Sequence, residues 1–169
     1  GRERGDTIMM ARGYDRLSQS FSPYTNLIYT DSVIALTEKL KHISYPAFGY
    51  ILKSYNYYNL DKFKMANDNA YTAYKKALSV DNLGQQLYIL DGLIFNKVVW
   101  GNKKEALELQ HKRHGLLMGE NYFKKLYVST RKTAREGIDG YYTKQKIDSY
   151  LSFAICHHYM RQHDSTAYY

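Results

Sequence analysis

The segment GYILKSYNYYNLDKFKMANDNAYTAYKKAL, residues 49–78, decides the fold, because two stretches of helical periodicity flank one short turn. Apolar and small residues recur at three- and four-residue steps on both sides of NLDKF, residues 59–63. We expect a helix over about 46–59 and a longer one over about 62–80. Pro46 suits the first turn of the earlier helix, with Ser44 as its cap. Two helices joined by so short a turn must pack as antiparallel neighbours.

The same periodicity continues toward both ends of the chain. Near the N-terminus, spacing from Ile8 to Phe21 predicts a helix capped by Asp6 or Thr7, then a turn at 20–26 and a helix through Leu40. Later helices are expected at 86–100, 103–118, about 121–136 and about 144–161. The turns between them are predicted at 81–86, at Gly101-Asn102, at Gly119 and at 136–142. Gly101 and Asn102 both tolerate the left-handed backbone that is common at the end of a helix. Strand-type alternation is nowhere sustained, which predicts an all-α fold.

Composition places the chain among globular proteins. Hydrophobic residues make up 44% and charged residues 24%, with two prolines, which excludes disordered and collagen-like classes. A chain of 169 residues suits a single domain over 1–169, or about four helical hairpins. The most apolar window, residues 88–100, is interrupted by polar residues and too short to cross a bilayer. GRERGDTIMM at the start lacks the apolar stretch of a signal peptide.

Residues 49–78 resemble a tetratricopeptide repeat. Tyr50, Ser54 and Tyr57 match its large, small and aromatic positions on the first helix, and Phe63 matches the aromatic position of the turn. The small residues of its second helix are matched by Ala66, Ala70 and Ala73. Small side chains there let two helices approach closely while aromatic rings fill the space between hairpins. Lys53 departs from the pattern, which has leucine at that place.

Partial copies of this repeat extend the resemblance. Residues 90–109 are similar, with Ala106 on the second helix, although Lys97 stands where an aromatic is usual. Ala66 and Ala106 are 40 residues apart, which indicates lengthened repeats. The opening hairpin fits on its first helix, and residues 150–169 resemble the start of another copy. The resemblance therefore implies an all-α solenoid of stacked antiparallel hairpins, about three and a half repeats, from a longer protein.

The style of these repeats resembles the arrays of Bacteroidetes-type regulators, in which such a region precedes a transmembrane helix and a DNA-binding or histidine-kinase module. The similarity is carried by GDTIMMARGYDRLSQSF, YPAFGYILKSYNYYN, GNKKEALEL and DSTAYY. It implies a sensory or protein-interaction role, no catalytic residues and no cofactor. It also implies a periplasmic location in a membrane-anchored protein; without it, the cytoplasm is the alternative.

A concave groove is the candidate ligand-binding surface. In the resembled repeat the groove is lined by Phe48, Ile51, Tyr55, Tyr58, Asn59, Tyr88, Asp91 and Phe95, and the matching pattern adds Val98 and Val99. Amphipathic rings with Asn and Asp suit an extended peptide or protein segment, since tyrosine combines apolar area with a hydrogen-bonding tip. The alternative is that these rings only complete the core at its edges.

Metal and enzyme chemistry find little support. His111 and His114 lie at helical spacing, and His157, His158 and His163 near the end, but three or four convergent ligands with acidic or cysteine partners are not evident. Cys156 and His157 are adjacent and point about 100° apart on a helix, so Cys156 is predicted to be a small core residue. Phosphate-loop, dinucleotide, nucleophile-elbow and HExxH motifs are absent from the sequence, and we expect no metal and no enzyme.

Positive charge is concentrated in residues 97–146, which hold 12 of the 24 Lys and Arg residues against five acids. Within it, the predicted helix 121–136 carries a basic face, formed by Lys124, Lys125, Arg131, Lys132 and Arg135. A solvated face is the first interpretation, and an anion or nucleic-acid site is the weaker one. A third hypothesis is self-assembly, because an uncapped terminal repeat exposes apolar surface.

Overall fold

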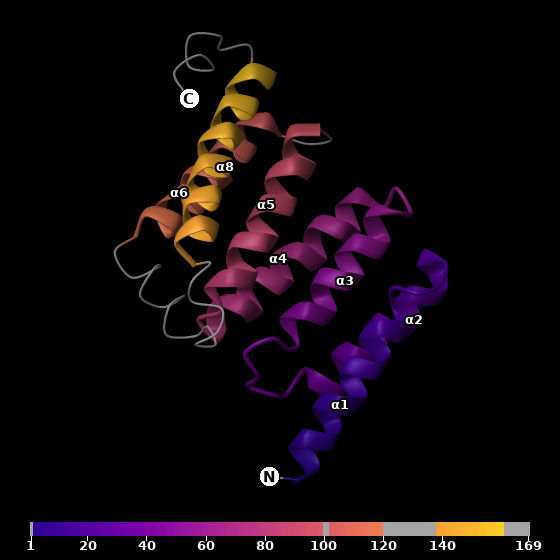
Figure 1. Ribbon diagram of the computed structural model, residues 1–169. Helices are drawn as coiled ribbons and strands as arrows, with labels where there is room; N and C mark the ends of the chain where they lie inside the picture. The colour runs from indigo at the N-terminus through magenta and orange to yellow at the C-terminus, as the bar shows by residue number, and fades with distance from the viewer. Residues whose placement is uncertain (1, 100–101, 120–137, 161–169) are drawn as a thin grey trace. The chain divides into compact units, whose positions relative to one another are not determined.

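A computed structural model describes residues 2–99, 102–119 and 138–160, and these ranges are helical throughout apart from short turns (Figure 1). The helices are α1 (Arg2–Leu17), α2 (Pro23–Thr37), α3 (Ala47–Tyr58), α4 (Phe63–Ser79), α5 (Leu83–Val99), α6 (Lys103–Met118) and α8 (Ile138–Tyr159). No strand occurs within the described ranges, so the predicted all-α class is confirmed. In that same part of the chain, no helix combines the length and the apolar character needed to span a bilayer.

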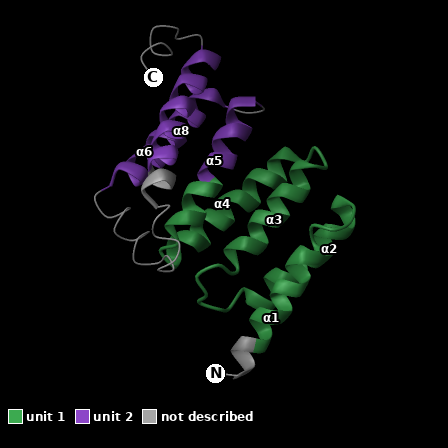
Figure 2. Cartoon of the chain, in the orientation of Figure 1, with its two compact units in different colours: residues 1–89 green, residues 90–169 purple. Residues whose placement is uncertain are grey.

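The chain divides into two compact units, residues 1–89 and residues 90–169, with the boundary inside α5 (Figure 2). The expectation of one domain over residues 1–169 stays a prediction.

In the first unit, helices that follow one another in sequence also pack together: α1 against α2, α2 against α3, and α3 against α4. The α3–α4 seam is lined by small side chains, since Ala66 and Ala73 are 0% exposed and Ala70 is also buried. The Ser54 hydroxyl on α3 donates to the Ala66 carbonyl on α4 at 2.8 Å. Alanine spacing on α4 thus produces the close helix pair that the sequence predicted.

The seam between α2 and α3 depends on different chemistry. Gly49 is buried there, and a Cβ atom at this position would lie 2.9 Å from Ile34 Cγ1 and 3.1 Å from Val33 Cγ1. About two helical turns beyond Gly49 on α3, the Asn26 amide donates to the Asn56 side-chain oxygen at 3.2 Å inside the seam. The repeat resemblance placed Tyr50, Ser54 and Tyr57 between helices. Ser54 does bond across to α4, and Tyr50 and Tyr57 are half-buried. The buried positions of α3 are Ala47, Gly49, Leu52 and Asn56.

Three element boundaries in this unit differ from the prediction. Helix α1 begins at Arg2, so neither Asp6 nor Thr7 is its cap. Ser22 caps α2 with its side chain and Pro23 occupies the first helical turn, so most of the predicted turn 20–26 is already helix. The backbone carbonyl of Ser44, not its hydroxyl, accepts a hydrogen bond from the Phe48 N–H, and the Tyr45–Pro46 peptide bond is cis.

The turns that end α3 and α4 both contain an aspartate in the left-handed region. Asp61 has φ 56° in the first turn and Asp81 has φ 52° in the second. Aspartate tolerates this backbone better than most residues do. The Asn82 side-chain oxygen then accepts from the Gln85 N–H at 3.0 Å, which starts α5 at Leu83. The predicted turn 81–86 is therefore shorter, and residues 83–86 are helical.

In the second unit, α6 packs against α8, and ion pairs join α5 to α6. Its buried apolar residues include Leu93, Ala106, Leu117 and Phe153. Asn102 has φ −87° and caps α6 through its side chain, so it is a helix start and not the predicted left-handed residue; Gly101 lies outside the described residues. Helix α8 begins at Ile138, so the predicted turn 136–142 is helical from that residue on. The predicted helix 121–136 also lies outside the described residues.

Candidate functional site

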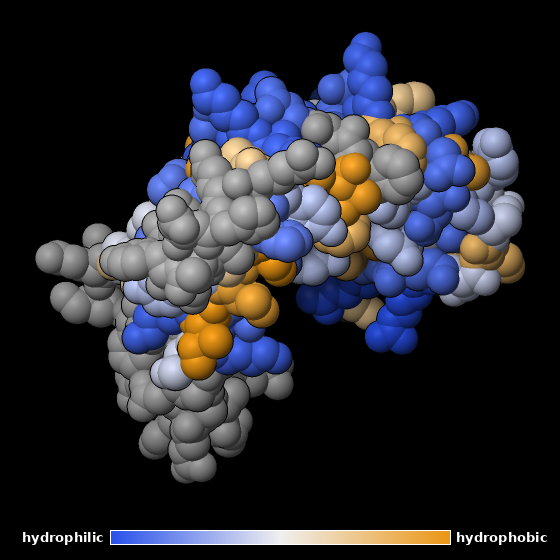
Figure 3. All heavy atoms as spheres, turned by 90° about the horizontal axis from the view of Figure 1, so that it is seen from above, coloured by the Kyte–Doolittle hydropathy of each residue, from blue (hydrophilic) through white to orange (hydrophobic). Residues whose placement is uncertain are grey.

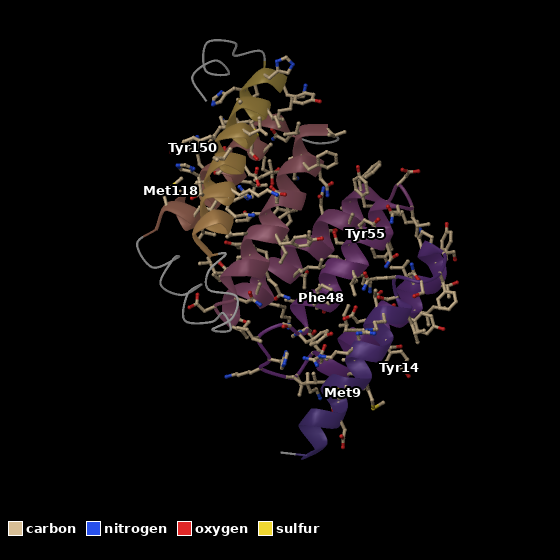
Figure 4. All side chains as sticks on the ribbon, in the orientation of Figure 1. Met9, Tyr14, Phe48, Tyr55, Met118 and Tyr150 are labelled. Atoms are coloured by element: carbon tan, nitrogen blue, oxygen red, sulfur yellow. The ribbon has the colours of Figure 1, made fainter. Side chains whose placement is uncertain are left out.

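Large aromatic side chains that face solvent are the strongest candidates for binding a partner. Three of the predicted groove residues belong to this group: Tyr55 on α3 is 62% exposed, and Tyr88 and Phe95 on α5 are 66% and 57% exposed. Figure 4 shows Tyr55 on α3 of the first unit, and Figure 3 shows hydrophobic residues reaching the surface between hydrophilic ones. Asn59, which follows α3, is exposed as well.

Other predicted groove residues are engaged inside the first unit. Phe48 packs against the core cluster of Ala11, Val33 and Tyr45, and its ring meets that of Tyr45 edge-on at 6.1 Å. The ring of Tyr58 meets Phe63 edge-on at 5.5 Å, and Ile51 is half-buried. Phe48 and Tyr58 thus pack against rings from outside their own helix, and their part in a groove stays a prediction. Among the matching α5 positions, Val98 is buried and Val99 is 42% exposed.

A charged network that sequence reasoning missed crosses α2, α3 and α4. Lys53 on α3 pairs with Asp31 on α2 at 2.6 Å, and Lys76 on α4 pairs with Glu38 after α2. Burial, and then the Glu38 carboxylate, raises the pKa of Tyr50, which lies among these groups. Lys53, where the resembled repeat has leucine, is thus engaged in an ion pair.

The second unit places Asp91 of α5 beside a buried arginine. Arg113 of α6 is 4% exposed, and its Nε lies 3.5 Å from a carboxylate oxygen of Asp91. One guanidinium nitrogen, Nη2, donates to the Gln145 side-chain oxygen on α8 at 3.3 Å. The other two, Nε and Nη1, are buried and have no hydrogen-bond partner among the described residues. The sequence pattern does not predict that Arg113 is buried, since it is one of twelve basic residues in the stretch 97–146.

Polar groups continue from Arg113 between α6 and α8. The Gln110 amide donates to the Ser149 carbonyl at 2.7 Å and lies 3.1 Å from its hydroxyl, which also contacts His114 Nδ1 at 3.1 Å. Burial, followed by nearby His111 and Arg113, lowers the pKa of His114. A histidine that resists protonation suits a packing role, and both imidazoles pack against the ring of Phe153, His111 tilted at a centroid distance of 4.8 Å and His114 edge-on at 5.2 Å.

The histidines and the cysteine do not assemble a metal centre in the described ranges, where no group of three or more His, Cys, Asp or Glu side chains is placed to hold an ion. His163 lies outside those ranges. Cys156 is 1% exposed, and burial raises the pKa of its thiol to about 11, so it is a core residue in the environment of an inert thiol.

A second exposed surface lies along one side of α8. Besides Tyr159 at its end (47% exposed), four large residues at helical spacing remain substantially exposed along this helix: Ile147 (61%), Tyr150 (43%), Leu151 (57%) and Ile155 (43%). The opposite side of α8 is buried at Ser149, Phe153 and Cys156. We call the four exposed residues the α8 apolar face. They share one side of the helix because, at about 100° per residue, the four positions fall within an arc of about 140°.

The predicted basic face, Lys124, Lys125, Arg131, Lys132 and Arg135, lies outside the described residues. The described binding candidates are therefore the exposed rings of α3 and α5, the Asp91–Arg113 pair and the α8 apolar face. Comparison of the chain with protein-family models, with curated proteins and with solved structures finds no match.

Proposed function

We propose that this chain is a non-catalytic protein- or peptide-binding domain built from tetratricopeptide-like hairpins, about three and a half repeats in all. The observation that carries the proposal is the exposure of Tyr55 and Tyr88, at 62% and 66%, at positions where the resembled repeat lines its groove. The buried alanines of α4 and Ala106 of α6 agree with the same repeat. By that resemblance the domain is the sensory or interaction part of a larger regulator or sensor kinase.

Exposed tyrosines favour binding for an energetic reason. An exposed tyrosine ring leaves apolar area in contact with water, and a partner that covers this area gains binding free energy. Little conformational entropy is lost on binding, because the side chain has few rotatable bonds. Aromatic residues are for this reason common among the residues that contribute most to protein interfaces. Tyr55 and Tyr88 have no role in the core that would account for their size, because most of each side chain lies outside it.

An immobilised library of random dodecapeptides would test the proposal. Selected peptides would be titrated against the wild type and against Tyr55→Ala and Tyr88→Ala. Removing one interface ring is expected to weaken binding by about tenfold or more. Tyr24→Ala is the matched control, because Tyr24 on α2 is 63% exposed and is not a groove position. The absence of any bound peptide, or equal losses in all three variants, would contradict the proposal.

Self-assembly is the second candidate, favoured by the α8 apolar face. The α8 apolar face groups four large exposed side chains on one side of a helix, and a grouped face of this kind, unlike a single exposed residue, normally meets another surface. Sedimentation over a range of concentrations would measure it, with Leu151→Glu as the disrupting variant and Ile28→Glu on α2, 66% exposed, as the control. A wild-type monomer at all concentrations, or association unchanged by Leu151→Glu, would refute this candidate.

A further inference from the structure

Arg113 carries a positive charge in the interior of the second unit with few partners to compensate it. Arg113 is 4% exposed, and within the described part of the chain Nε and Nη1 have no hydrogen-bond partner and Nη2 bonds only to the neutral Gln145 oxygen, at 3.3 Å. An arginine stays charged in a protein, so it cannot relieve this burial by losing a proton. An acidic group must therefore stay close to it.

Asp91 is that group. Its carboxylate lies 3.5 Å from Arg113 Nε, and among the described residues no other acidic side chain lies within ion-pair distance of Arg113. The two members of the pair differ sharply in access to solvent, with side-chain exposures of 5% for Arg113 and 61% for Asp91. Asp91 thus presents a carboxylate at the surface whose position is biased by a buried charge behind it.

The surroundings of Asp91 are apolar on its own helix. Phe95 follows four residues later on α5 and is 57% exposed, and Val99 follows four residues after that at 42% exposed. Residues at this spacing share one side of a helix. The carboxylate therefore stands at one end of an exposed strip of Asp91, Phe95 and Val99, which we call the α5 strip.

We propose that the α5 strip binds a lysine or arginine side chain of a peptide partner, with Asp91 accepting from the cationic head and Phe95 covering the aliphatic stem. This inference rests on the proposed peptide-binding function and names the chemistry of the partner. Arg113 acts as a positioning residue, because it holds Asp91 without touching the partner.

The partner is expected to be cationic because solvent reaches the Asp91 carboxylate and not the Arg113 guanidinium. An anionic ligand would have to contact the guanidinium, but the two nitrogens that lack partners are buried. A cation meets the accessible carboxylate directly, and a long methylene stem beside it can cover the exposed ring of Phe95. A carboxylate already fixed in place loses less freedom on binding than one that rotates in solvent.

Peptides selected from the dodecapeptide library would be resynthesised with each lysine or arginine replaced by norleucine, which keeps the stem and removes the charge. We expect the selected peptides to contain a basic residue whose replacement weakens binding by about tenfold at low salt, and by less at high salt. Asp91→Asn should abolish this preference while leaving the binding of the norleucine peptide unchanged. Glu108→Gln, which removes an exposed acid from α6, should keep the preference and serves as the control for charge.

Each outcome decides something. Arg113→Lys should reduce the preference for the basic peptide, whereas a purely structural role would lower thermal stability and leave the preference intact. If the wild type binds peptides but prefers none with a basic residue, or if the preference does not respond to salt, the inference fails and the proposed function survives. If the wild type binds no peptide, the proposed function fails and the inference fails with it. The salt series uses the wild type alone, so it gives a result even where a variant does not fold.

Discussion

The buried pair Asn26 and Asn56 offers the sharpest test of how the first unit is held together. Asn26 is 6% exposed and Asn56 is 1% exposed. The Asn26 oxygen accepts from the Phe21 N–H at 3.1 Å, and its amide donates to the Phe21 carbonyl at 3.0 Å and to Asn56 at 3.2 Å. The Asn56 amide donates to the Leu52 carbonyl at 3.0 Å. Asn26 therefore ties the α1–α2 turn to its own helix and to α3.

The structure sets the expected magnitudes. Asn26→Ala leaves three polar groups without their partner, and a buried group so stranded costs about 1–3 kcal/mol. Because the Phe21 groups lie near the surface and can take up water, we expect a loss of about 3 kcal/mol in the free energy of unfolding. Asn56→Ala strands the Asn26 amide only in part and should cost about 2 kcal/mol. A single hydrogen bond joins the two residues, so their coupling should be about 1 kcal/mol.

Urea denaturation followed by circular dichroism would measure both single variants and the double variant. Asn69→Ala is the control, since the Asn69 amide donates to the Met65 carbonyl on the exposed side of α4 at 2.7 Å, and it should change stability by less than about 0.5 kcal/mol. Single effects no larger than that of the control, or a coupling near zero, would refute the claim that this polar pair secures the α2–α3 seam.

Three further predictions test other parts of the two units. Gly49→Ala should lower the free energy of unfolding by about 1–3 kcal/mol, because the new methyl would meet Ile34 and Val33, whereas Gly13→Ala, with open space around it, should be neutral or stabilising in the same urea assay. Cys156 should react with iodoacetamide about a hundredfold more slowly in the folded protein than in urea, since burial raises its pKa to about 11; equal rates would contradict its burial. The pKa of His114 is lowered from 6.5, so the unfolded state binds a proton first, and stability should fall as pH drops below 6.5. His114→Gln should flatten that part of the pH profile, and an unchanged profile would contradict the assignment.

Helix content and the small-residue seam were predictable because both depend on spacing along the chain. The alanines at 66, 70 and 73 recur at the step that keeps them on one side of a helix, and all are buried there. Turn boundaries were less predictable, because residues such as Pro23 and Leu83 can stand at the start of a helix as readily as inside a loop. Composition marks the neighbourhood of a turn, whereas individual caps such as Ser22 and Asn102 set its limits.

The candidate site was predictable only where exposure follows directly from helical phase, as for Tyr55, Tyr88 and Phe95. Phe48 and Tyr58 share that phase, yet each finds a ring from outside its own helix, Tyr45 and Phe63 respectively. No periodicity reports such a contact, because it depends on how the connecting segments fold back. Arg113 was missed for a related reason, since a lone arginine in a basic stretch gives no sign that α5 and α8 will enclose it.

Hydrogen bonds between helices fix the register in which the helices pack, and so determine which rings stay exposed. A seam of alanine and leucine alone can slide by a turn at small cost, whereas a slide would break the Asn26–Asn56 bond in one unit and the Gln110–Ser149 bonds in the other. Each of those bonds lies where water cannot replace it, so the helices are held in one register. A fixed register in turn fixes which residues face outward. Surface substitutions at Tyr55 or Phe95 should then alter binding while leaving the seams intact, and substitutions in the seams should alter stability first.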